Sequence, residues 1–137
     1  MISGIGIDLV EIARIKKAYE RSSFPFVKRV LTAPELQYFH TFDLEKRKIE
    51  WLAGRFAAKE ALAKAIGTGF GKELSMQDIT IQADAFGKPT FQLASKVTSR
   101  FQENIRFHLS ITHTEHVAAA FVVASREIED CRIGGKK

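Results

Sequence analysis

The feature that most constrains this chain is an alanine-rich stretch that ends in glycines, from Trp51 to Gly71. Its centre, Arg55 to Gly69, reads RFAAKEALAKAIGTG, and its many alanines give it a high propensity for α-helix. Gly67 stands where a glycine commonly ends a helix, and the two glycines beyond it allow the backbone to come close to a ligand. The sequence therefore predicts a helix that leads into a ligand-binding loop.

Two charged side chains of this helix, Glu60 and Lys64, are one turn apart and lie on the same ridge. The other residues that flank Glu60 at helical spacing are apolar, so Lys64 is the one local group that can solvate its carboxylate. The simpler interpretation is an exposed ion pair, which helix statistics favour. The alternative is a metal-binding carboxylate followed by a phosphate-binding lysine. This alternative needs a second carboxylate, and Asp8 supplies it.

The composition is that of a single folded domain. The chain has 137 residues, of which 45% are hydrophobic, and no apolar run reaches the ~18 residues of a membrane span. The start of the sequence lacks the pattern of a secretory signal, and Cys131 is the only cysteine, which excludes an intramolecular disulfide and suits a reducing cytoplasm. A net charge of +5 favours a polyanionic partner, namely nucleic acid, an acidic protein or a phosphorylated small molecule.

The first residues alternate as a strand does. One face of residues 2–10 carries Ile5, Ile7 and Leu9, and the other carries Gly4, Gly6, Asp8 and Val10. We expect the two glycines on the face of Asp8 to leave open space beside its carboxylate. An alternative is that Asp8 caps or charges the start of the following helix, and the strand by itself favours neither role.

Residues 11–21 have the pattern of an amphipathic helix with a basic outer face. That face carries Arg14, Lys17 and Arg21. A solvated surface is the commoner explanation of such a face. The alternative is a docking surface for a helix of an acidic protein, to which Phe24 and Phe26 would add apolar anchors.

The remaining elements follow from periodicity and turn signals. A helical region at 27–43 contains a capping box that begins at Thr32, and in the charged run after it Lys46 and Arg47 can reach a phosphate. We expect strands at 78–83, 90–93, 105–112 and 117–124, and a helix at 95–104. The last strand is apolar on both faces and should be central in its sheet.

This order of elements predicts an α+β fold, with a mainly antiparallel sheet and helices packed on it. We expect one domain, residues 1–125, followed by a polar tail, residues 126–137. Repeated βαβ units are missing, and GIGIDL does not match G-x-G-x-x-G, so a dinucleotide-binding fold is not supported.

Asp8 and Glu60 are the candidate metal ligands. One aspartate and one glutamate, with water or backbone oxygens, suit Mg²⁺, because that ion holds few protein carboxylates and bridges substrate phosphates. The four histidines and one cysteine do not favour zinc. Ser110 and His113 lie near the last turn, but no nucleophile elbow supports a Ser–His–Asp hydrolase.

Four motifs together resemble one family. GIGIDLVEI, RFAAKEALAKAIGTG, FGKP and HLSITHTEHVAAAFVV stand in the order and spacing of the holo-acyl-carrier-protein synthases, the small bacterial type of 4′-phosphopantetheinyl transferase. The resemblance covers residues 1 to about 124. Its most specific part is the combination of Asp8 near the start with the motif W-x-x-x-x-F-A-x-K-E-A that begins at Trp51. The turn departs from the expected Asn-Gly-Lys-Pro at Phe86 alone.

The resemblance implies transfer of 4′-phosphopantetheine from coenzyme A to a serine of an apo acyl carrier protein, with release of adenosine 3′,5′-bisphosphate, in support of fatty acid synthesis. It implies that Asp8 and Glu60 hold Mg²⁺ and that Lys64 adds positive charge beside the same phosphate oxygens. The implied contacts of coenzyme A are Arg55, Lys64, Gly67, Thr68, Gly69, Lys88, Pro89, Ser110 and His113. The acidic carrier protein would dock on Arg14, Lys17, Arg21 and Phe24.

The resemblance also implies a homotrimer with active sites between subunits, and the apolar strand at 117–124 agrees with such an interface. The competing hypothesis is a basic, non-catalytic module that binds nucleic acid. That hypothesis predicts aromatic side chains interleaved with basic ones on an exposed sheet face, and the expected strands carry few of them. We therefore expect neither nucleic acid nor a membrane among the partners.

Overall fold

The computed structural model describes residues 1–101 and 104–127, and it has the α+β architecture that the sequence predicts. A three-stranded antiparallel sheet has the order β1–β5–β4, and a separate antiparallel hairpin pairs β2 with β3. The strands are β1 (Ile2–Glu11), β2 (Ile79–Ala83), β3 (Pro89–Leu93), β4 (Ile105–His113) and β5 (Val117–Arg126). The helices are α1 (Ile12–Arg21), α2 (Ser23–Val30), α3 (Ala33–Phe39), α4 (Glu45–Ile66) and α5 (Ser95–Thr98), with a 3₁₀ turn η1 (Met76–Asp78) before β2.

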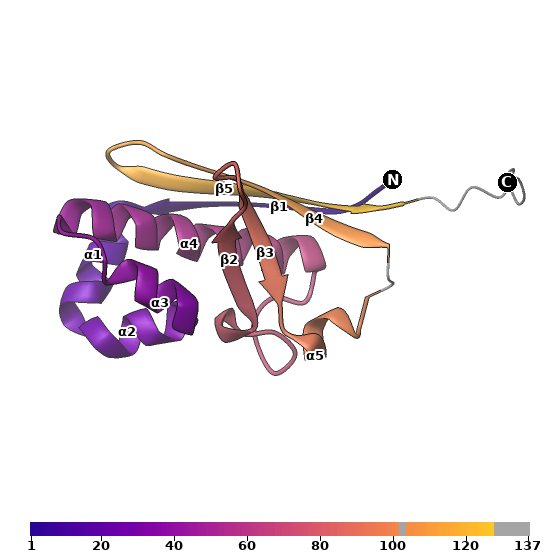
Figure 1. Cartoon of the computed structure of the whole chain (residues 1–137), viewed down its shortest axis with the longest axis horizontal. Helices are drawn as coiled ribbons and strands as arrows, with labels where there is room; N and C mark the ends of the chain where they lie inside the picture. The colour runs from indigo at the N-terminus through magenta and orange to yellow at the C-terminus, as the bar shows by residue number, and fades with distance from the viewer. Residues whose placement is uncertain (102–103, 128–137) are drawn as a thin grey trace, which may run out of the picture.

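The helices gather on one face of the three-stranded sheet, and α4 lies along that face (Figure 1). The centre of the core is formed by small and aliphatic side chains of α4 and β5, including Leu52, Leu62, Ala118, Ala120 and Val122. β5 is the central strand, as its apolar sequence predicts. The alanines on both elements allow the helix to pack closely on the sheet.

The glycines of β1 lie where the helix and the sheet come closest. The expectation of open space beside Asp8 is wrong, because α4 covers the face of β1 that carries Gly4 and Gly6. A Cβ at Gly6 would overlap the carbonyl oxygen of Ala61, and a Cβ at Gly4 would overlap that of Ala65. These positions therefore need glycine so that β1 can approach the backbone of α4.

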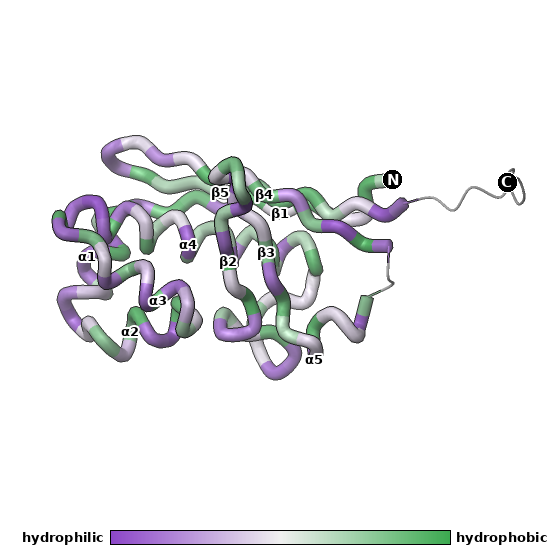
Figure 2. The backbone as a smooth tube through the Cα atoms, in the orientation of Figure 1, coloured by the Kyte–Doolittle hydropathy of each residue, from purple (hydrophilic) through white to green (hydrophobic). Residues whose placement is uncertain are grey.

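The opposite face of the three-stranded sheet, the outer face, is covered by no other described element. It is apolar along β1 and β5, whereas β4 contributes polar side chains to it, namely Arg106, His108, Ser110 and Thr112. Ile5, Ile7 and Leu9 of β1 are 59%, 63% and 67% exposed, and Phe121 of β5, which pairs with Ile7, is 44% exposed. Figure 2 shows hydrophobic stretches along the strands of this sheet with no helix on the outer side. A contiguous apolar surface of this kind marks an interaction site on a folded protein.

The region between α1 and α4 differs from the single helical region expected at 27–43. α2 begins earlier, at Ser23, and a break at Leu31 and Thr32 separates it from α3. The capping box is present, and the Glu35 carboxylate accepts a hydrogen bond from the backbone N–H of Thr32 at 2.8 Å. The charged run at 45–50 forms the first turns of α4.

α5 is shorter than the helix expected at 95–104. It ends at Thr98, whose hydroxyl donates back to the carbonyl of Ser95 at 3.2 Å, and Ser99 donates in the same way to the carbonyl of Lys96. Hydroxyls that bond to nearby carbonyls in this way compete with helix propagation.

Near its C-terminal end the sheet runs slightly further than expected. β5 extends through Arg126, one residue beyond the expected domain boundary. Most of the expected tail, including Cys131, lies outside the described residues. Within residues 1–101 and 104–127, no helix combines the length and the apolar character that crossing a membrane requires.

Candidate active site

Three of the predicted site residues meet where β1 packs on α4. Asp8 lies on β1, and Glu60 and Lys64 lie on α4. The Nζ atom of Lys64 is 3.2 Å from Oδ1 of Asp8, and it donates a hydrogen bond to the carbonyl of Ile7 at 2.9 Å. The ion pair of Lys64 is therefore with Asp8, across the helix–strand contact, rather than with its helical neighbour Glu60.

The electrostatics of Glu60 place its carboxylate close to that of Asp8. The pKa of Glu60 is raised, chiefly because its side chain is partly buried and next because the negative charge of Asp8 is near, while Lys64 acts in the opposite direction. Two carboxylates beside one ammonium leave an excess of negative charge. A divalent cation would relieve this repulsion.

The loop after α4 has the conformation that its glycines allow. Gly67 ends α4 with a φ of 95°, and Gly69 has a φ of 66°, so both lie in the left-handed region. Thr68 between them is exposed, and its hydroxyl donates to the carbonyl of Gly69 at 3.0 Å. This loop follows the end of α4 that carries Lys64.

A second group of predicted residues lines a cleft between α3, the first half of α4 and the β2–β3 turn. The cleft consists of two cavities of about 340 Å³ and about 600 Å³ that share Trp51, Arg55, Ala83 and Gly87 as walls. We call it the Arg55 cleft. The guanidinium carbon of Arg55 lies 4.6 Å from the centre of the Trp51 ring, and Arg55 Nε is buried without a hydrogen-bond partner among the described residues. Burial lowers the pKa of Arg55, and the carboxylate of Glu35 acts in the opposite direction.

Several other candidates for coenzyme A contact belong to the Arg55 cleft. Arg47, Pro89 and His113 line it, and Lys88 stands beside Pro89 on the exposed β2–β3 turn. His113 also takes part in the β4–β5 turn, where its Nδ1 lies 3.2 Å from the carbonyl oxygen of Thr114. The ring of His113 is exposed, so this contact leaves it accessible from the cleft.

Two further candidates, Ser110 and Lys46, lie elsewhere. Ser110 belongs to the outer face of β4, where it is paired across the sheet with Phe121. Lys46 lines a different cavity of about 330 Å³, together with Ile12 and Glu115. Within one chain, neither residue shares the cleft with Arg55.

The candidates therefore form two groups on opposite sides of α4. Arg55 and Lys64 are nine residues apart, which is about 2.5 helical turns and directs their side chains in opposite directions. The Asp8–Glu60–Lys64 cluster lies toward β1, whereas the Arg55 cleft includes His113 of β4, and β5 separates these two strands in the sheet.

The basic face of α1 is exposed, as predicted. Its three basic residues all reach solvent: Arg14, Lys17 and Arg21. Beside them Phe24 is 57% exposed, and the Lys28 ammonium lies 5.6 Å from the centre of its ring. The expectation of a second apolar anchor at Phe26 is wrong, because α2 begins at Ser23 and turns Phe26 into the core, where it is 8% exposed.

The structure also contains a buried ion pair that sequence reasoning missed. Lys59 and Glu35 are almost fully buried, and the Nζ of Lys59 is 2.7 Å from Oε1 of Glu35. Burial lowers the pKa of Lys59, and Glu35 counteracts this. The sequence did contain a signal for this pair. Lys59 lies among buried alanines of α4, including Ala58 and Ala61, and a lysine in such a place needs a buried partner.

The comparisons with known proteins agree with this arrangement. Residues 4–122 match the family model of the 4′-phosphopantetheinyl transferase superfamily. This chain belongs to that superfamily. A holo-[acyl-carrier-protein] synthase of Staphylococcus haemolyticus is 49% identical to this transferase. The matched region covers 92% of the present chain and 98% of the Staphylococcus protein. A protein of the same name from Lactococcus lactis subsp. lactis is 48% identical, over 92% and 99%.

Solved structures of such synthases share the fold of this transferase. The crystal structure from Neisseria meningitidis has a TM-score of 0.84 and 40% identity, covering 92% of this chain and 100% of its own. The Bacillus anthracis structure, a complex with CoA (3′,5′-ADP), has a TM-score of 0.79 and 40% identity, covering 93% and 99%. The chain is thus an enzyme rather than the non-catalytic module that its basic composition left as an alternative.

Proposed function

We propose that this transferase moves the 4′-phosphopantetheine group of coenzyme A to a serine of an apo acyl carrier protein and releases adenosine 3′,5′-bisphosphate. The similarity to holo-[acyl-carrier-protein] synthases over almost the whole chain supports this reaction. The observation that carries it is the meeting of Asp8, Glu60 and Lys64 at the contact of β1 with α4. Two carboxylates and one ammonium are the groups needed to handle a magnesium-bound pyrophosphate.

Asp8 and Glu60 would hold Mg²⁺. The raised pKa of Glu60 agrees with this assignment, because burial, the larger cause, and the nearby charge of Asp8, the smaller one, both disfavour a carboxylate without a bound cation. One aspartate and one glutamate suit Mg²⁺, because that ion keeps several waters and binds substrate phosphates. When bound, the ion supplies charge that neutralises the pyrophosphate oxygens.

The residues around this pair bind and orient the substrate. Lys64 is held beside Asp8 and adds a fixed positive charge for the phosphate oxygens. The backbone of Gly67, Thr68 and Gly69 can approach the ligand closely, because both glycines adopt conformations without a side chain in the way. The proton of the attacking serine passes to a carboxylate or to a water molecule.

A homotrimer with shared active sites accounts for the separation of the two residue groups. Coenzyme A is long and highly charged, yet the Arg55 cleft and the Asp8–Glu60–Lys64 cluster of one chain face opposite sides of α4. A neighbouring chain would bring its Arg55 cleft to the cluster of the first chain. The exposed apolar outer face supports assembly, since Ile7 and Phe121 would otherwise remain in water.

The exposed basic face of α1 would dock the acyl carrier protein. Arg14, Lys17 and Arg21 provide positive charge for an acidic partner, and Phe24 provides an exposed apolar contact. A cytoplasmic location, expected from the single cysteine, stays a prediction.

Mass spectrometry tests the reaction directly. An apo acyl carrier protein is incubated with coenzyme A, Mg²⁺ and the transferase, and its mass should rise by that of one phosphopantetheine group. The Asp8→Asn variant is the matched control and should give little or no product. A carrier protein of unchanged mass with the wild-type enzyme, in the presence of metal and coenzyme A, would reject the proposal.

A further inference from the structure

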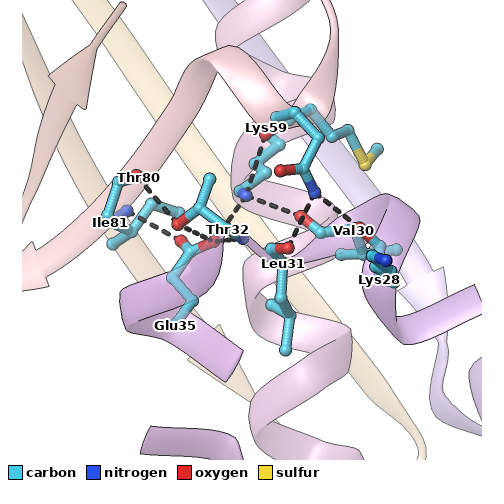
Figure 3. A network of polar contacts seen from close by, with 10 residues as sticks. Lys28, Val30, Leu31, Thr32, Glu35, Lys59, Thr80 and Ile81 are labelled. Atoms are coloured by element: carbon cyan, nitrogen blue, oxygen red, sulfur yellow. Dashed lines mark hydrogen bonds and ion pairs between the residues drawn. The ribbon is translucent and has the colours of Figure 1, made fainter. Parts of the chain in front are cut away.

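A buried polar network holds the walls of the Arg55 cleft together. At its centre the Lys59 ammonium donates three hydrogen bonds, to the carbonyl of Val30 at 2.6 Å, to Oε1 of Glu35 at 2.7 Å and to the carbonyl of Met76 at 3.1 Å (Figure 3). An ammonium has three N–H donors, so Lys59 is fully satisfied although its side chain is 0% exposed. This single side chain therefore fixes α4 to α2, α3 and η1.

Glu35 extends the network to the β2–β3 hairpin. Its Oε1 also accepts the backbone N–H of Thr32 at 2.8 Å, and its Oε2 accepts the backbone N–H of Ile81 at 2.8 Å. The hydroxyl of Thr80 donates to that of Thr32 at 2.8 Å, and Figure 3 shows these groups converging from β2 and the start of α3. These contacts hold β2, and with it the turn that carries Lys88, against the helices.

The network lies at the base of the Arg55 cleft. Glu35 and Ile81 line the larger cavity of the cleft together with Trp51 and Arg55. Arg55 is one helical turn before Lys59 and so lies on the same side of α4. One buried carboxylate thus stands near two cations, which leaves net positive charge at the base of the cleft for an anionic ligand.

A purely stabilising role is a weak explanation for this ion pair. Taking two charges out of water costs free energy that their attraction often fails to recover, and apolar residues of similar volume frequently serve as well. An apolar pair would fill the space, but it would leave the N–H of Ile81 without its acceptor, so that the hairpin would lose its hydrogen bond to Glu35. What the ion pair provides is a fixed geometry between the hairpin and α4.

We propose that Glu35 and Lys59 are positioning residues for coenzyme A. They hold the β2–β3 hairpin and the Arg55 side of α4 at the separation that a phosphate-bearing ligand requires, and they act through these walls rather than on the reacting atoms. This inference rests on the proposed function, since it takes coenzyme A as the occupant of the Arg55 cleft.

The test measures coenzyme A binding through the fluorescence of Trp51, which is the only tryptophan and lies in the cleft. The first variant, Glu35→Leu with Lys59→Met, removes both charges and every acceptor for Ile81. The second, Glu35→Gln with Lys59→Met, removes the charges but keeps an oxygen for Ile81. The control is Val97→Ala, which opens a core cavity in α5, a helix that contributes no residue to the Arg55 cleft or the Asp8–Glu60–Lys64 cluster.

We expect the Leu/Met variant to raise the Kd and the KM for coenzyme A by about tenfold, because a binding group that is slightly misplaced loses much of its effect. The KM for the carrier protein should not change, and the Gln/Met variant should recover part of the affinity. Val97→Ala should keep the wild-type KM values although it lowers stability. The fluorescence titration measures the binding of coenzyme A in the cleft directly. A loss of stability elsewhere in the fold would leave this Kd unaltered.

Two results would overturn the positioning role. One is a folded Leu/Met variant that binds coenzyme A as tightly as the wild type. The other is a parallel rise of both KM values that Val97→Ala reproduces. If the Leu/Met variant does not fold, the Gln/Met variant decides. Its Kd should rise about threefold, because the charge-assisted hydrogen bonds that hold the hairpin against α4 are lost, and an unchanged Kd is the contrary result. A wild-type enzyme that fails to bind coenzyme A would instead overturn the proposed function, and this inference with it.

Discussion

Gly6 of β1 lies directly against the carbonyl oxygen of Ala61 of α4, without room for a Cβ between them. This contact sets the distance between the strand that carries Asp8 and the helix that carries Glu60. The Gly6→Ala substitution should therefore push α4 away from β1, and it should lower the free energy of unfolding by about 1–3 kcal/mol, as overpacking usually does. Urea denaturation measures the stability.

The same substitution should reduce phosphopantetheine transfer, because it separates the members of the Asp8–Glu60–Lys64 cluster. Gly71→Ala is the matched control, since a Cβ at Gly71 meets nothing within 4 Å. That control should retain the stability of the wild type and leave the Asp8–Glu60–Lys64 cluster in place. Equal behaviour of the two variants would show that the close approach at Gly6 has no role in the site.

The metal requirement of transfer should depend on both carboxylates. Asp8→Asn and Glu60→Gln each remove one proposed Mg²⁺ ligand, so each should nearly abolish transfer while leaving the circular dichroism spectrum unchanged. Rates are measured across a titration of Mg²⁺ or Mn²⁺. A variant with wild-type rates at every metal concentration would remove that residue from the proposed metal site.

The raised pKa of Glu60 predicts a specific dependence of stability on pH. A carboxyl group whose pKa is higher in the folded state stabilises the fold while it is protonated, and this contribution is lost as the pH rises through the folded pKa. In metal-free buffer, Glu60→Gln should match the wild type below the ordinary titration range of glutamate and exceed its unfolding free energy at neutral pH.

Nuclear magnetic resonance of the Glu60 carboxyl carbon checks the cause of this shift. Asp8→Asn should lower the pKa of Glu60 only part of the way toward its ordinary value, because burial is the larger cause and Asp8 the smaller one. A titration curve of Glu60 that is identical in wild type and Asp8→Asn would show that the two carboxylates do not interact.

The basic face of α1 should govern encounter with the carrier protein. Reversing two exposed charges, in the variant Arg14→Glu with Arg21→Glu, should raise the KM for the carrier protein by about tenfold or more and leave the KM for coenzyme A unchanged. The effect should shrink at high salt because exposed charges are screened. The variant Lys72→Glu with Lys96→Glu, outside α1, is a control that changes the net charge by the same amount. A carrier KM that responds equally to both variants would indicate net charge rather than a docking surface.

The site could be predicted from sequence where its signals are local or periodic. The C-terminal end of α4 follows from alanine propensity and Gly67, and the exposed face of α1 follows from helical periodicity. The opposite directions of Ser110 and His113 also follow from local geometry, because residues three apart on a strand lie on opposite faces. The family resemblance names both residues as contacts of coenzyme A, and within one chain the strand places them on different faces.

What could not be predicted depends on contacts distant in sequence. Glu35 and Lys59 are 24 residues apart, and neither flanking segment indicates the other as its partner. The crowding of Gly6 depends on which face of β1 receives α4, and the strand pattern offers two candidate faces. The glycine face receives the helix because its lack of side chains lets the backbones approach. The larger apolar side chains of β1 are thereby left on the outer face.

The outer face and the two residue groups of α4 together predict a homotrimer whose active sites are shared between chains. Light scattering at micromolar concentration should give the mass of three chains. The replacement Ile7→Asp, at the pairing of Ile7 with Phe121, should dissociate the assembly, because a charge would then be buried in an apolar contact. A wild-type enzyme that is monomeric and fully active at that concentration would contradict the shared site.

Complementation between inactive variants distinguishes a shared site from one confined to a single chain. Asp8→Asn removes one carboxylate from the Asp8–Glu60–Lys64 cluster, and Arg55→Ala removes the guanidinium from the Arg55 cleft. A homotrimer of either variant alone should be nearly inactive. If every site combines Asp8 of one chain with Arg55 of its neighbour, mixed trimers refolded from equal amounts contain intact sites. Their activity should be about a quarter of wild type, the chance that two adjacent chains each contribute the intact residue. A single-chain site has no intact combination, so an inactive mixture of correctly assembled trimers would place Asp8 and Arg55 of each site on the same chain.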